Sequence, residues 1–358
     1  MKKLNGTTVI IIPAFKPNKG LLEYIDQLYL HYLTNIVIVN DGSGSNYESI
    51  FLKLANKGCI VLKHHKNLGK GAALKTAFHY VEQNFAKDVS IVTADADGQH
   101  DAGDVVRLAQ ESRKFPQSLI LGVRDFSKGD TPFKSLFGNR VTSIFFSLLY
   151  GERLSDTQTG LRAFNAKLLP FLQSISGTRF EYELEMIISC IRANIAIHTI
   201  PIQVIYKDGN SGTHFKAIRD SVRVMSVLFM SFFKFISTSL IGATVDIGIA
   251  WLLLDLLRSL LEGQDYVRIL IATVSARIIS IMVNYLLNKN FVFKSKGKES
   301  LWRYLSLSLI IILSSSTGVY FIHIFTPIND KIAKLICDVL LFILSYYLQQ
   351  KWVFKKKE

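Results

Sequence analysis

The stretch "VSIVTADADGQHDAGD", residues 89–104, joins a short apolar run to a dense group of carboxylates. Valine, isoleucine and threonine favour a β-strand, and this run ends abruptly in polar and turn-forming residues. Asp95, Asp97, Asp101 and Asp104 follow within ten residues, so their negative charges repel one another unless a cation lies nearby. The stretch predicts a buried strand that delivers acidic side chains to one edge of a sheet.

Other runs in the first half of the chain have the same character. They are "TTVIIIPAF" (7–15), "NIVIVNDGS" (35–43), "CIVLKHH" (59–65) and "SLILGVRDF" (118–126). Segments with helical spacing separate them, such as "GLLEYIDQLYLHYL" (20–33) and "GKGAALKTAFHYVEQNF" (69–85). This alternation predicts an α/β, Rossmann-like domain with a mostly parallel sheet and helices on both faces. Ligands of such sheets bind beyond the carboxyl ends of the strands, where these runs become polar.

The composition predicts two parts. The chain has 358 residues, 49% of them hydrophobic, with a mean hydropathy of +0.27, which is high for a soluble protein. Its formal charge of +14 suits nucleic acid, a phosphate-bearing substrate or an anionic membrane face. Three scattered cysteines exclude a disulfide framework. The first apolar run is short and meets a proline, so it predicts a strand and a cytosolic domain, not a signal peptide.

The second half predicts an all-α membrane domain with four transmembrane helices. Apolar runs lie near 233–257, 267–289, 303–325 and 331–351, each close to the ~20 residues that cross a bilayer. Basic residues cluster at 289–303 and 351–357, which predicts a cytosolic N-terminal domain and C-terminus. "NYLLNKNFVFKSK" (284–296) and "SYYLQQKWVFKKK" (345–357) indicate two repeated hairpins.

Charged residues in and before these runs leave alternatives open. Residues 212–229 form a basic amphipathic pattern, which fits a helix at the membrane interface or one packed on the soluble domain. Asp246, Arg277 and Asp338 lie inside spans, where charges are usually paired. Either an Asp246–Arg277 or an Arg277–Asp338 pair is expected, as a structural contact or as a polar path. The predicted domains are 1–210, a juxtamembrane helix over 211–232, and 233–358.

Six motifs occur in order across residues 39–186: "VNDGS", "NLGKGAALKTA", "DADGQHD", "LGVRDF", "SDTQTGLRAF" and "FEYELEM". This series resembles the polyprenyl-phosphate (dolichol-phosphate mannosyltransferase-like) glycosyltransferases of family 2, which have the GT-A fold. The four-span half is similar to the GtrA-like membrane family. The resemblance implies a nucleotide-sugar, a Mg²⁺ or Mn²⁺ cofactor, and inverting transfer of the sugar to a lipid phosphate.

The donor side of the site follows from the motif after the fourth run. Asp95 and Asp97 stand two apart at a strand end, so both can face one hard cation, and Gln99 adds a neutral oxygen. By resemblance these three hold the metal, whereas Asp101 and Asp104 are expected in a solvated loop or at a helix start. Asp41 remains open between a nucleotide contact and a helix cap. The residues predicted to bind the nucleotide-sugar are Pro13, Ala14, Phe15, Asp41, Lys70, Asp95 and Gln158.

The acceptor side rests on two arginines. Arg124, Arg140 and Ser143 match positions that resemble the acceptor-phosphate site of the family, and arginine grips phosphate with paired hydrogen bonds. The residues predicted to be catalytic are Asp156, Asp97 and Arg124. Asp156 is open between a base or orienting group and a structural turn with an Asp–Arg pair. The chain departs from the family at one further motif near its start. The family usually has "PAYNE" there, whereas this chain has "PAFKP" (13–17).

The leading hypothesis is transfer of one sugar from a UDP- or GDP-sugar to a polyprenyl phosphate such as undecaprenyl phosphate, at the cytosolic face of the cell membrane, for glycosylation of cell-envelope polysaccharide. One alternative is a processive polysaccharide synthase, although no Q-x-x-R-W motif occurs. Another is a lipid-linked sugar transporter or scaffold with a degenerate transferase domain. The expected partners are the nucleotide-sugar, the lipid phosphate and the membrane, without nucleic acid, and a homo-oligomer stays open.

Overall fold

The computed structural model describes residues 8–124, 133–203, 217–293, 295, 299–326 and 329–354. The chain divides into two compact units. The first comprises Met1–Ser147 and Glu152–Leu228, and the second comprises Leu148–Gly151 and Phe229–Glu358. The domain boundaries drawn from the sequence stay predictions.

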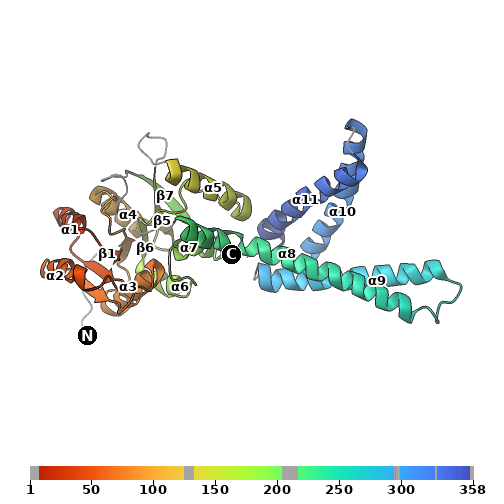
Figure 1. The fold of residues 1–358 in the computed structure, drawn as a ribbon, viewed down its shortest axis with the longest axis horizontal. Helices are drawn as coiled ribbons and strands as arrows, with labels where there is room; N and C mark the ends of the chain where they lie inside the picture. Colours follow the sequence, from red (N-terminus) through yellow and green to blue (C-terminus); the bar gives the residue numbers. More distant parts are fainter. Residues whose placement is uncertain are drawn as a thin grey trace. The chain divides into compact units, whose positions relative to one another are not determined.

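The first unit is built on one mixed sheet (Figure 1). In the described part of the chain this sheet has seven strands in the order β3-β2-β1-β4-β6-β5-β7. All neighbours run parallel except β6, which is antiparallel to both β4 and β5. The strands are β1 (Thr8–Ala14), β2 (Ile36–Asn40), β3 (Ile60–Lys63), β4 (Ser90–Thr93), β5 (Leu119–Arg124), β6 (Arg162–Asn165) and β7 (Ile197–Ile202). This architecture is the GT-A arrangement, so the fold class expected from the sequence is confirmed.

Helices cover both faces of this sheet because its central strands are apolar on both sides. Ile10 and Ile12 of β1 face a core that α1, α2 and α4 also enter, whereas α3 packs on the sheet together with α6 and α7. The bounds are α1 (Gly20–Leu30), α2 (Glu48–Asn56), α3 (Lys70–Asn84), α4 (Ala102–Lys114), α5 (Phe133–Tyr150), α6 (Leu169–Gln173) and α7 (Glu181–Arg192). Short 3₁₀ turns, η1 (Ser45–Tyr47) and η2 (Ala166–Leu168), precede α2 and α6. Burial of both sheet faces places the polar strand ends at the edges, where a site can form.

Long apolar helices make up most of the second unit, although the first of them begins in residues that belong to the first unit. Among the described residues, four helices are long and apolar enough to cross a membrane: Val222–Leu256, Asp265–Val292, Ser300–Ile322 and Lys331–Val353. They belong to α8 (Ala217–Leu256), α9 (Asp265–Leu287), α10 (Ser300–Phe325) and α11 (Asp330–Leu348), with π-helical turns η4 (Asn288–Val292) and η5 (Gln349–Val353).

Helix α8 changes one detail of the expected organisation. It runs for 40 residues without interruption, so its first part and the first span form a single element and not two helices. Residues 211–216 of the predicted juxtamembrane helix lie outside the described residues. A continuous hydrogen-bonded helix is expected here, because no proline or glycine interrupts residues 217–241.

The two hairpins meet through equivalent residues. Asn288 Nδ2 donates to Gln349 Oε1 over 3.0 Å, and these residues are 61 positions apart, the offset of the sequence repeat. The rings of Phe293 and Phe354, at the same offset, stack with centroids 5.0 Å apart. Contact between equivalent positions is the mark of an approximate two-fold relation, so the repeated motifs pack against each other.

The charges within the spans form separate pairs. Arg277 Nη2 lies 3.1 Å from Asp246 Oδ2, and Ser280 Oγ donates to the same aspartate. Asp338 instead binds Lys334, one helical turn earlier, at 2.7 Å. Of the two alternatives, the Asp246–Arg277 pair is therefore the one that forms, which neutralises both charges where water is scarce.

Candidate active site

The carboxyl ends of neighbouring strands gather the residues predicted for the nucleotide-sugar. Pro13 and Ala14 end β1 and Phe15 follows it, while Asp41 comes directly after β2. Asp95 follows β4, which pairs with β1 in parallel. These strands end at one edge of the sheet, so the predicted residues lie along that edge.

Asp41 holds the loop that leads into α3. Its Oδ1 accepts from Leu68 N and its Oδ2 from Gly69 N, both over 2.8 Å, and His64 Nδ1 lies 2.7 Å from Oδ1. The His64 Nε2 atom lies 2.9 Å from Thr76 Oγ1, within α3. The carboxylate is buried and satisfied by long-range contacts, so it organises the loop and does not cap the turn after β2. Its contact with a nucleotide stays a prediction.

The role of His64 was not predicted. This imidazole joins Asp41 to α3. The contact follows from the register of the sheet, because Asp41 and His64 directly follow the paired residues Asn40 and Lys63 of parallel strands. Residues at matching positions after paired parallel strands are neighbours.

Lys70, the first residue of α3, lies between two carboxylates. Its Nζ is 2.6 Å from Asp95 Oδ1 and 2.8 Å from Glu183 Oε1. Burial opposes ionisation of Asp95, but the Lys70 ammonium and His100 outweigh it, so the pKa of Asp95 lies below its usual range. Burial likewise opposes the charge on Lys70, yet Asp95 and Glu183 raise its pKa. Lys70 and Asp95 therefore favour each other's charged form, and the Glu183 carboxylate contacts the same ammonium.

The pKa of Asp97 is shifted in the opposite direction to that of Asp95. Burial raises the pKa of its carboxyl, and the negative charge of Asp95 raises it further. Gln99 N donates to Asp97 Oδ1 over 3.1 Å, so the loop curls around this acid. A carboxyl that resists ionisation beside an ionised neighbour is suited to share a cation with it.

The predicted metal ligands fit a hard divalent cation. Tyr24 Oη and His100 Nδ1 are buried and have no hydrogen-bond partner in the described part of the chain. Burial raises the pKa of Tyr24, and the negative charges of Asp95 and Asp97 raise it further. In the described ranges, no group of three His, Cys, Asp or Glu side chains is arranged to hold a metal. The predicted set contains two carboxylates and one amide, which are oxygen ligands that Mg²⁺ and Mn²⁺ accept.

The remaining acids of this motif have structural roles. Asp101 is the N-cap of α4, and its Oδ1 accepts from Gly103 N over 2.8 Å. Asp104 is paired with Arg107 and accepts from Gln203 N. Both lie at the helix start, as expected, although Asp104 is buried. These two carboxylates are therefore engaged in capping a helix and in an ion pair, and they are not part of the predicted metal-ligand set.

Gly160 allows the "DTQTG" segment to approach Asp95, a predicted metal ligand. A methyl group at position 160 would collide with the Asp95 carboxylate, so glycine allows this close approach. Thr93 Oγ1 fixes the segment by donating to the Gly160 carbonyl over 2.9 Å. The "DTQTG" segment is therefore in direct contact with the end of β4.

Asp156 and Arg124 form a two-pronged ion pair. Arg124 Nε lies 2.6 Å from Asp156 Oδ2, and its Nη2 lies 3.0 Å from Oδ1. Gln158 N also donates to this carboxylate, whose side chain is fully buried. The structure thus contains the Asp–Arg pair that was the second alternative for Asp156. A buried carboxylate that contacts two nitrogens of one guanidinium group is well placed to orient that arginine.

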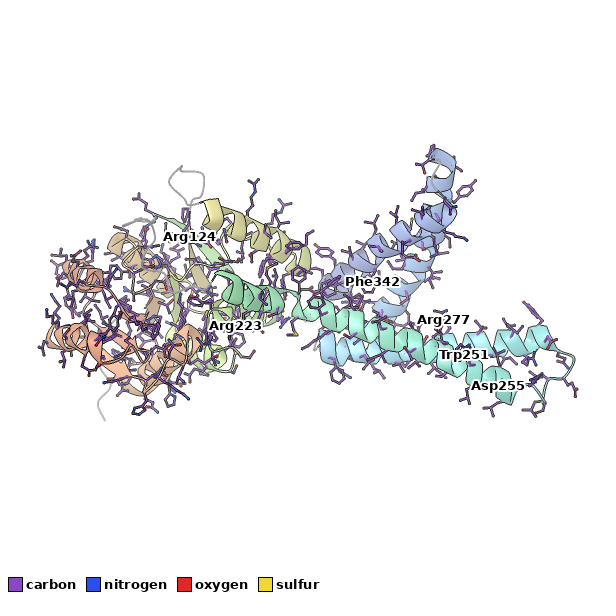
Figure 2. The ribbon with its side chains drawn as sticks, in the orientation of Figure 1. Arg124, Arg223, Trp251, Asp255, Arg277 and Phe342 are labelled. Carbon is purple, nitrogen blue, oxygen red and sulfur yellow. The ribbon has the colours of Figure 1, made fainter. Side chains whose placement is uncertain are left out.

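A cavity of about 810 Å³ opens beside this pair. Arg124, labelled in Figure 2, contributes to its wall together with Arg140 and Ser143, so the structure brings together the three residues predicted for the acceptor phosphate. Arg153 was missed by the sequence reasoning; it lies two residues before the motif that contains Asp156. The lining residues are Val123, Arg124, Asn139, Arg140, Ser143, Ile144, Ser147, Arg153, Leu154, Ser155, Thr199 and Pro201.

Comparison with known proteins assigns both halves of the chain. A family model described as glycosyl transferase family 2 matches residues 9–171, and one described as GtrA/DPMS, transmembrane domain, matches residues 234–354. The UDP-N-acetylglucosamine–dolichyl-phosphate N-acetylglucosaminyltransferase of Methanococcus voltae is 30% identical over 219 residues, covering 56% of this chain and 86% of the relative. An uncharacterized protein of Methanocaldococcus jannaschii is 30% identical over 203 residues, covering 56% and 82%.

Part of the chain is also similar to solved structures, at low sequence identity. Glucosyl-3-phosphoglycerate synthase from Mycobacterium tuberculosis, crystallised with Mn²⁺, UDP-glucose and phosphoglyceric acid, has a TM-score of 0.47 at 14% identity and covers 63% of this chain and 79% of its own. Mannosyl-3-phosphoglycerate synthase from Rubrobacter xylanophilus has a TM-score of 0.43 at 16% identity, covering 63% and 72%.

The GT-A sheet and the apolar helices together define a membrane-associated glycosyltransferase. The chain belongs to glycosyl transferase family 2, and its second half is a GtrA-like transmembrane domain.

Proposed function

We propose that this enzyme transfers a single sugar from a nucleotide-sugar to a polyprenyl phosphate, such as undecaprenyl phosphate, for cell-envelope polysaccharide glycosylation. The observation that carries the proposal is the cavity at the end of β5, whose wall includes Arg124, Arg140 and Arg153. Three guanidinium groups around one cavity suit an acceptor that carries phosphate. The name of the Methanococcus voltae relative supports both this acceptor class and a UDP-linked donor, while a GDP-linked donor stays open.

The cavity also suits the lipid part of such an acceptor. Helix α5 supplies Arg140 and Ser143 to the wall, and Ile144 and Phe145 on the same helix are exposed. A phosphate group and an isoprenoid chain need polar and apolar contacts side by side, and one helix offers both. The long apolar helices of the second unit support a membrane-embedded substrate.

In this proposal the residues have separate tasks. Asp95, Asp97 and Gln99 would hold Mg²⁺ or Mn²⁺, which supplies positive charge to the diphosphate of the sugar donor. Lys70 stands at the start of α3, where helix N–H groups also favour phosphate. Arg124, fixed by Asp156, faces the acceptor phosphate with Arg140. Because a phosphate oxygen is already ionised near neutral pH, attack on the sugar carbon requires orientation more than a base.

We place the reaction at the cytosolic leaflet of the cell membrane. Support comes from the basic residues near 289–303 and 351–357, which follow the second and fourth apolar helices. Under the positive-inside rule these ends are cytosolic, as is the N-terminal domain. A nucleotide-sugar, which is charged and made in the cytosol, is available on that side.

A reconstituted assay tests the proposal. The full chain is incubated with undecaprenyl phosphate, Mn²⁺ or Mg²⁺ and a panel of nucleotide-sugars, and the lipid is analysed by mass spectrometry. The expected product is the lipid with one added sugar. A polymer would indicate a processive synthase, and no glycolipid with any donor would refute the proposed transfer.

Two matched variants link the product to the cavity. Arg140→Ala is expected to raise the KM for the lipid phosphate about tenfold or more, because it removes a charged hydrogen-bond donor. Lys114→Ala removes one positive charge at the end of α4 and should leave this KM unchanged. Equal effects of the two variants would show that general surface charge, and not the cavity, attracts the acceptor.

A further inference from the structure

Glu183 connects a third element to the acidic edge of the sheet. It lies in the first turn of α7, its side chain is only 8% exposed, and its Oε1 is 2.8 Å from Lys70 Nζ. Lys70 in turn contacts Asp95 over 2.6 Å. The row Glu183–Lys70–Asp95 therefore joins α7, α3 and the end of β4 through one ammonium group.

The backbone around Glu183 is firmly held. Arg162 Nη1 donates to the Glu183 carbonyl over 2.5 Å from β6. The turn before α7 is tied to the start of α3, where Ala72 N donates to the Thr178 carbonyl over 2.8 Å. Glu183 is thus a fixed anchor, whereas Lys70 reaches it through a flexible four-carbon side chain.

Asp95 and Glu183 have different roles as ionic partners of Lys70. Asp95 is a predicted metal ligand, so a divalent cation bound there would repel the neighbouring ammonium. A buried ammonium without an anionic partner is strongly unfavourable. Glu183 is not among the predicted metal ligands, and it keeps Lys70 paired while Asp95 turns to the cation.

We propose that Glu183 is a positioning residue of the sugar-donor site: it anchors the Lys70 ammonium beside Asp95 and thereby sets the affinity of the site for a divalent cation. Without Glu183, Lys70 has Asp95 as its remaining carboxylate partner in the row, and it competes with the metal for that carboxylate. The inference rests on the proposed metal site, and it adds a residue that is expected to touch neither metal nor substrate.

Metal binding without donor or acceptor tests this role. Mn²⁺ is titrated into the full chain, and the free ion is measured by electron paramagnetic resonance. Glu183→Gln keeps the size of the side chain and removes its charge, and we expect the Kd for Mn²⁺ to rise about tenfold. Glu183→Asp restores the charge on a shorter side chain and should recover most of the affinity.

Glu185→Gln is the matched control. This residue lies on the same helix and loses the same charge, but its carboxylate is 3.6 Å from Arg192. Its Kd for Mn²⁺ should stay within about twofold of the unaltered chain. In a Lys70→Met background, Glu183→Gln should add no further loss, because the effect passes through Lys70.

Three results would overturn the proposal: equal effects of the variants at 183 and 185, persistence of the Glu183→Gln effect without Lys70, or no recovery by Glu183→Asp. If Mn²⁺ does not bind the unaltered chain, the metal site itself is wrong and this role fails with it. If Mn²⁺ binds but no glycolipid forms, the proposed transfer fails while the role of Glu183 stands on the titrations.

Discussion

Replacement of Asp156 by asparagine separates two roles that the sequence left open. Asparagine keeps the shape of the side chain and can still accept from Gln158 N and from one nitrogen of Arg124. It removes the charge and one of the two contacts of the ion pair, whose carboxylate is fully buried. The change therefore loosens Arg124 without opening a cavity in the core.

The structure predicts the size of the effect. A hydrogen bond between charged groups contributes about 1.5–3 kcal/mol, and Arg124 is partly exposed, so about 2 kcal/mol of positioning is lost. If Arg124 holds the acceptor phosphate, kcat/KM for the lipid falls by about 30-fold, chiefly through KM. A general base would instead contribute about 100- to 10,000-fold, and its loss would appear in kcat.

Steady-state kinetics with varied lipid phosphate at a saturating nucleotide-sugar distinguishes these outcomes. The double variant with Arg124→Gln should be little worse than Arg124→Gln alone, because both act through one pair. A fall in kcat of a thousandfold or more, with an unchanged KM for the lipid and a flattened acid limb of the pH profile, would refute the positioning role.

Further changes probe other parts of the structure. Gly160→Ala should weaken Mn²⁺ binding at least about tenfold, because its methyl group must displace the Asp95 carboxylate; calorimetry measures this. Burial raises the pKa of the Cys190 thiol to about 12 from 9.0, so iodoacetamide at pH 8 should label it only after unfolding. The difference between the two pKa values of Cys190 stabilises the folded state fully below pH 9. This stabilisation is lost as the pH rises toward 12, because the thiol of the unfolded chain ionises at a lower pH than the buried one. Asn288→Leu and Gln349→Leu should each cost about 1 kcal/mol in detergent thermal unfolding, and together less than the sum, since they share one hydrogen bond.

The strands that the sequence predicts are those that form long apolar runs. β6 and β7 were not predicted individually, for identifiable reasons. β6 has four residues and begins with Arg162, which is buried because its guanidinium donates to the Thr159 and Glu183 carbonyls. β7 contains Pro201 and is only partly buried, so its alternation is weak. Tertiary contacts, not local pattern, specify both strands.

The candidate site shows the same division. The spacing of Asp95 and Asp97 is a local signal, and it indicates a shared cation without knowledge of the fold. The contact of Lys70 with Glu183 joins residues 113 positions apart on α3 and α7, and no spacing rule connects them. Ion pairs of this kind depend on how helices pack on a sheet, so a single sequence does not reveal them.

The reversed direction of β6 explains why the segment with Asp156 and Gly160 precedes a strand, whereas Asp41 and Asp95 follow theirs. In a parallel sheet the carboxyl ends of the strands share an edge, and Asp41 and Asp95 reach it after β2 and β4. An antiparallel strand presents its amino end at that edge, so the segment before β6 arrives there. This places Asp156 beside Arg124 at the end of β5 and Gly160 against Asp95. A polar motif directly before a buried strand, in a chain where Asp41 and Asp95 follow strands, is therefore itself a sequence signal for an antiparallel insertion.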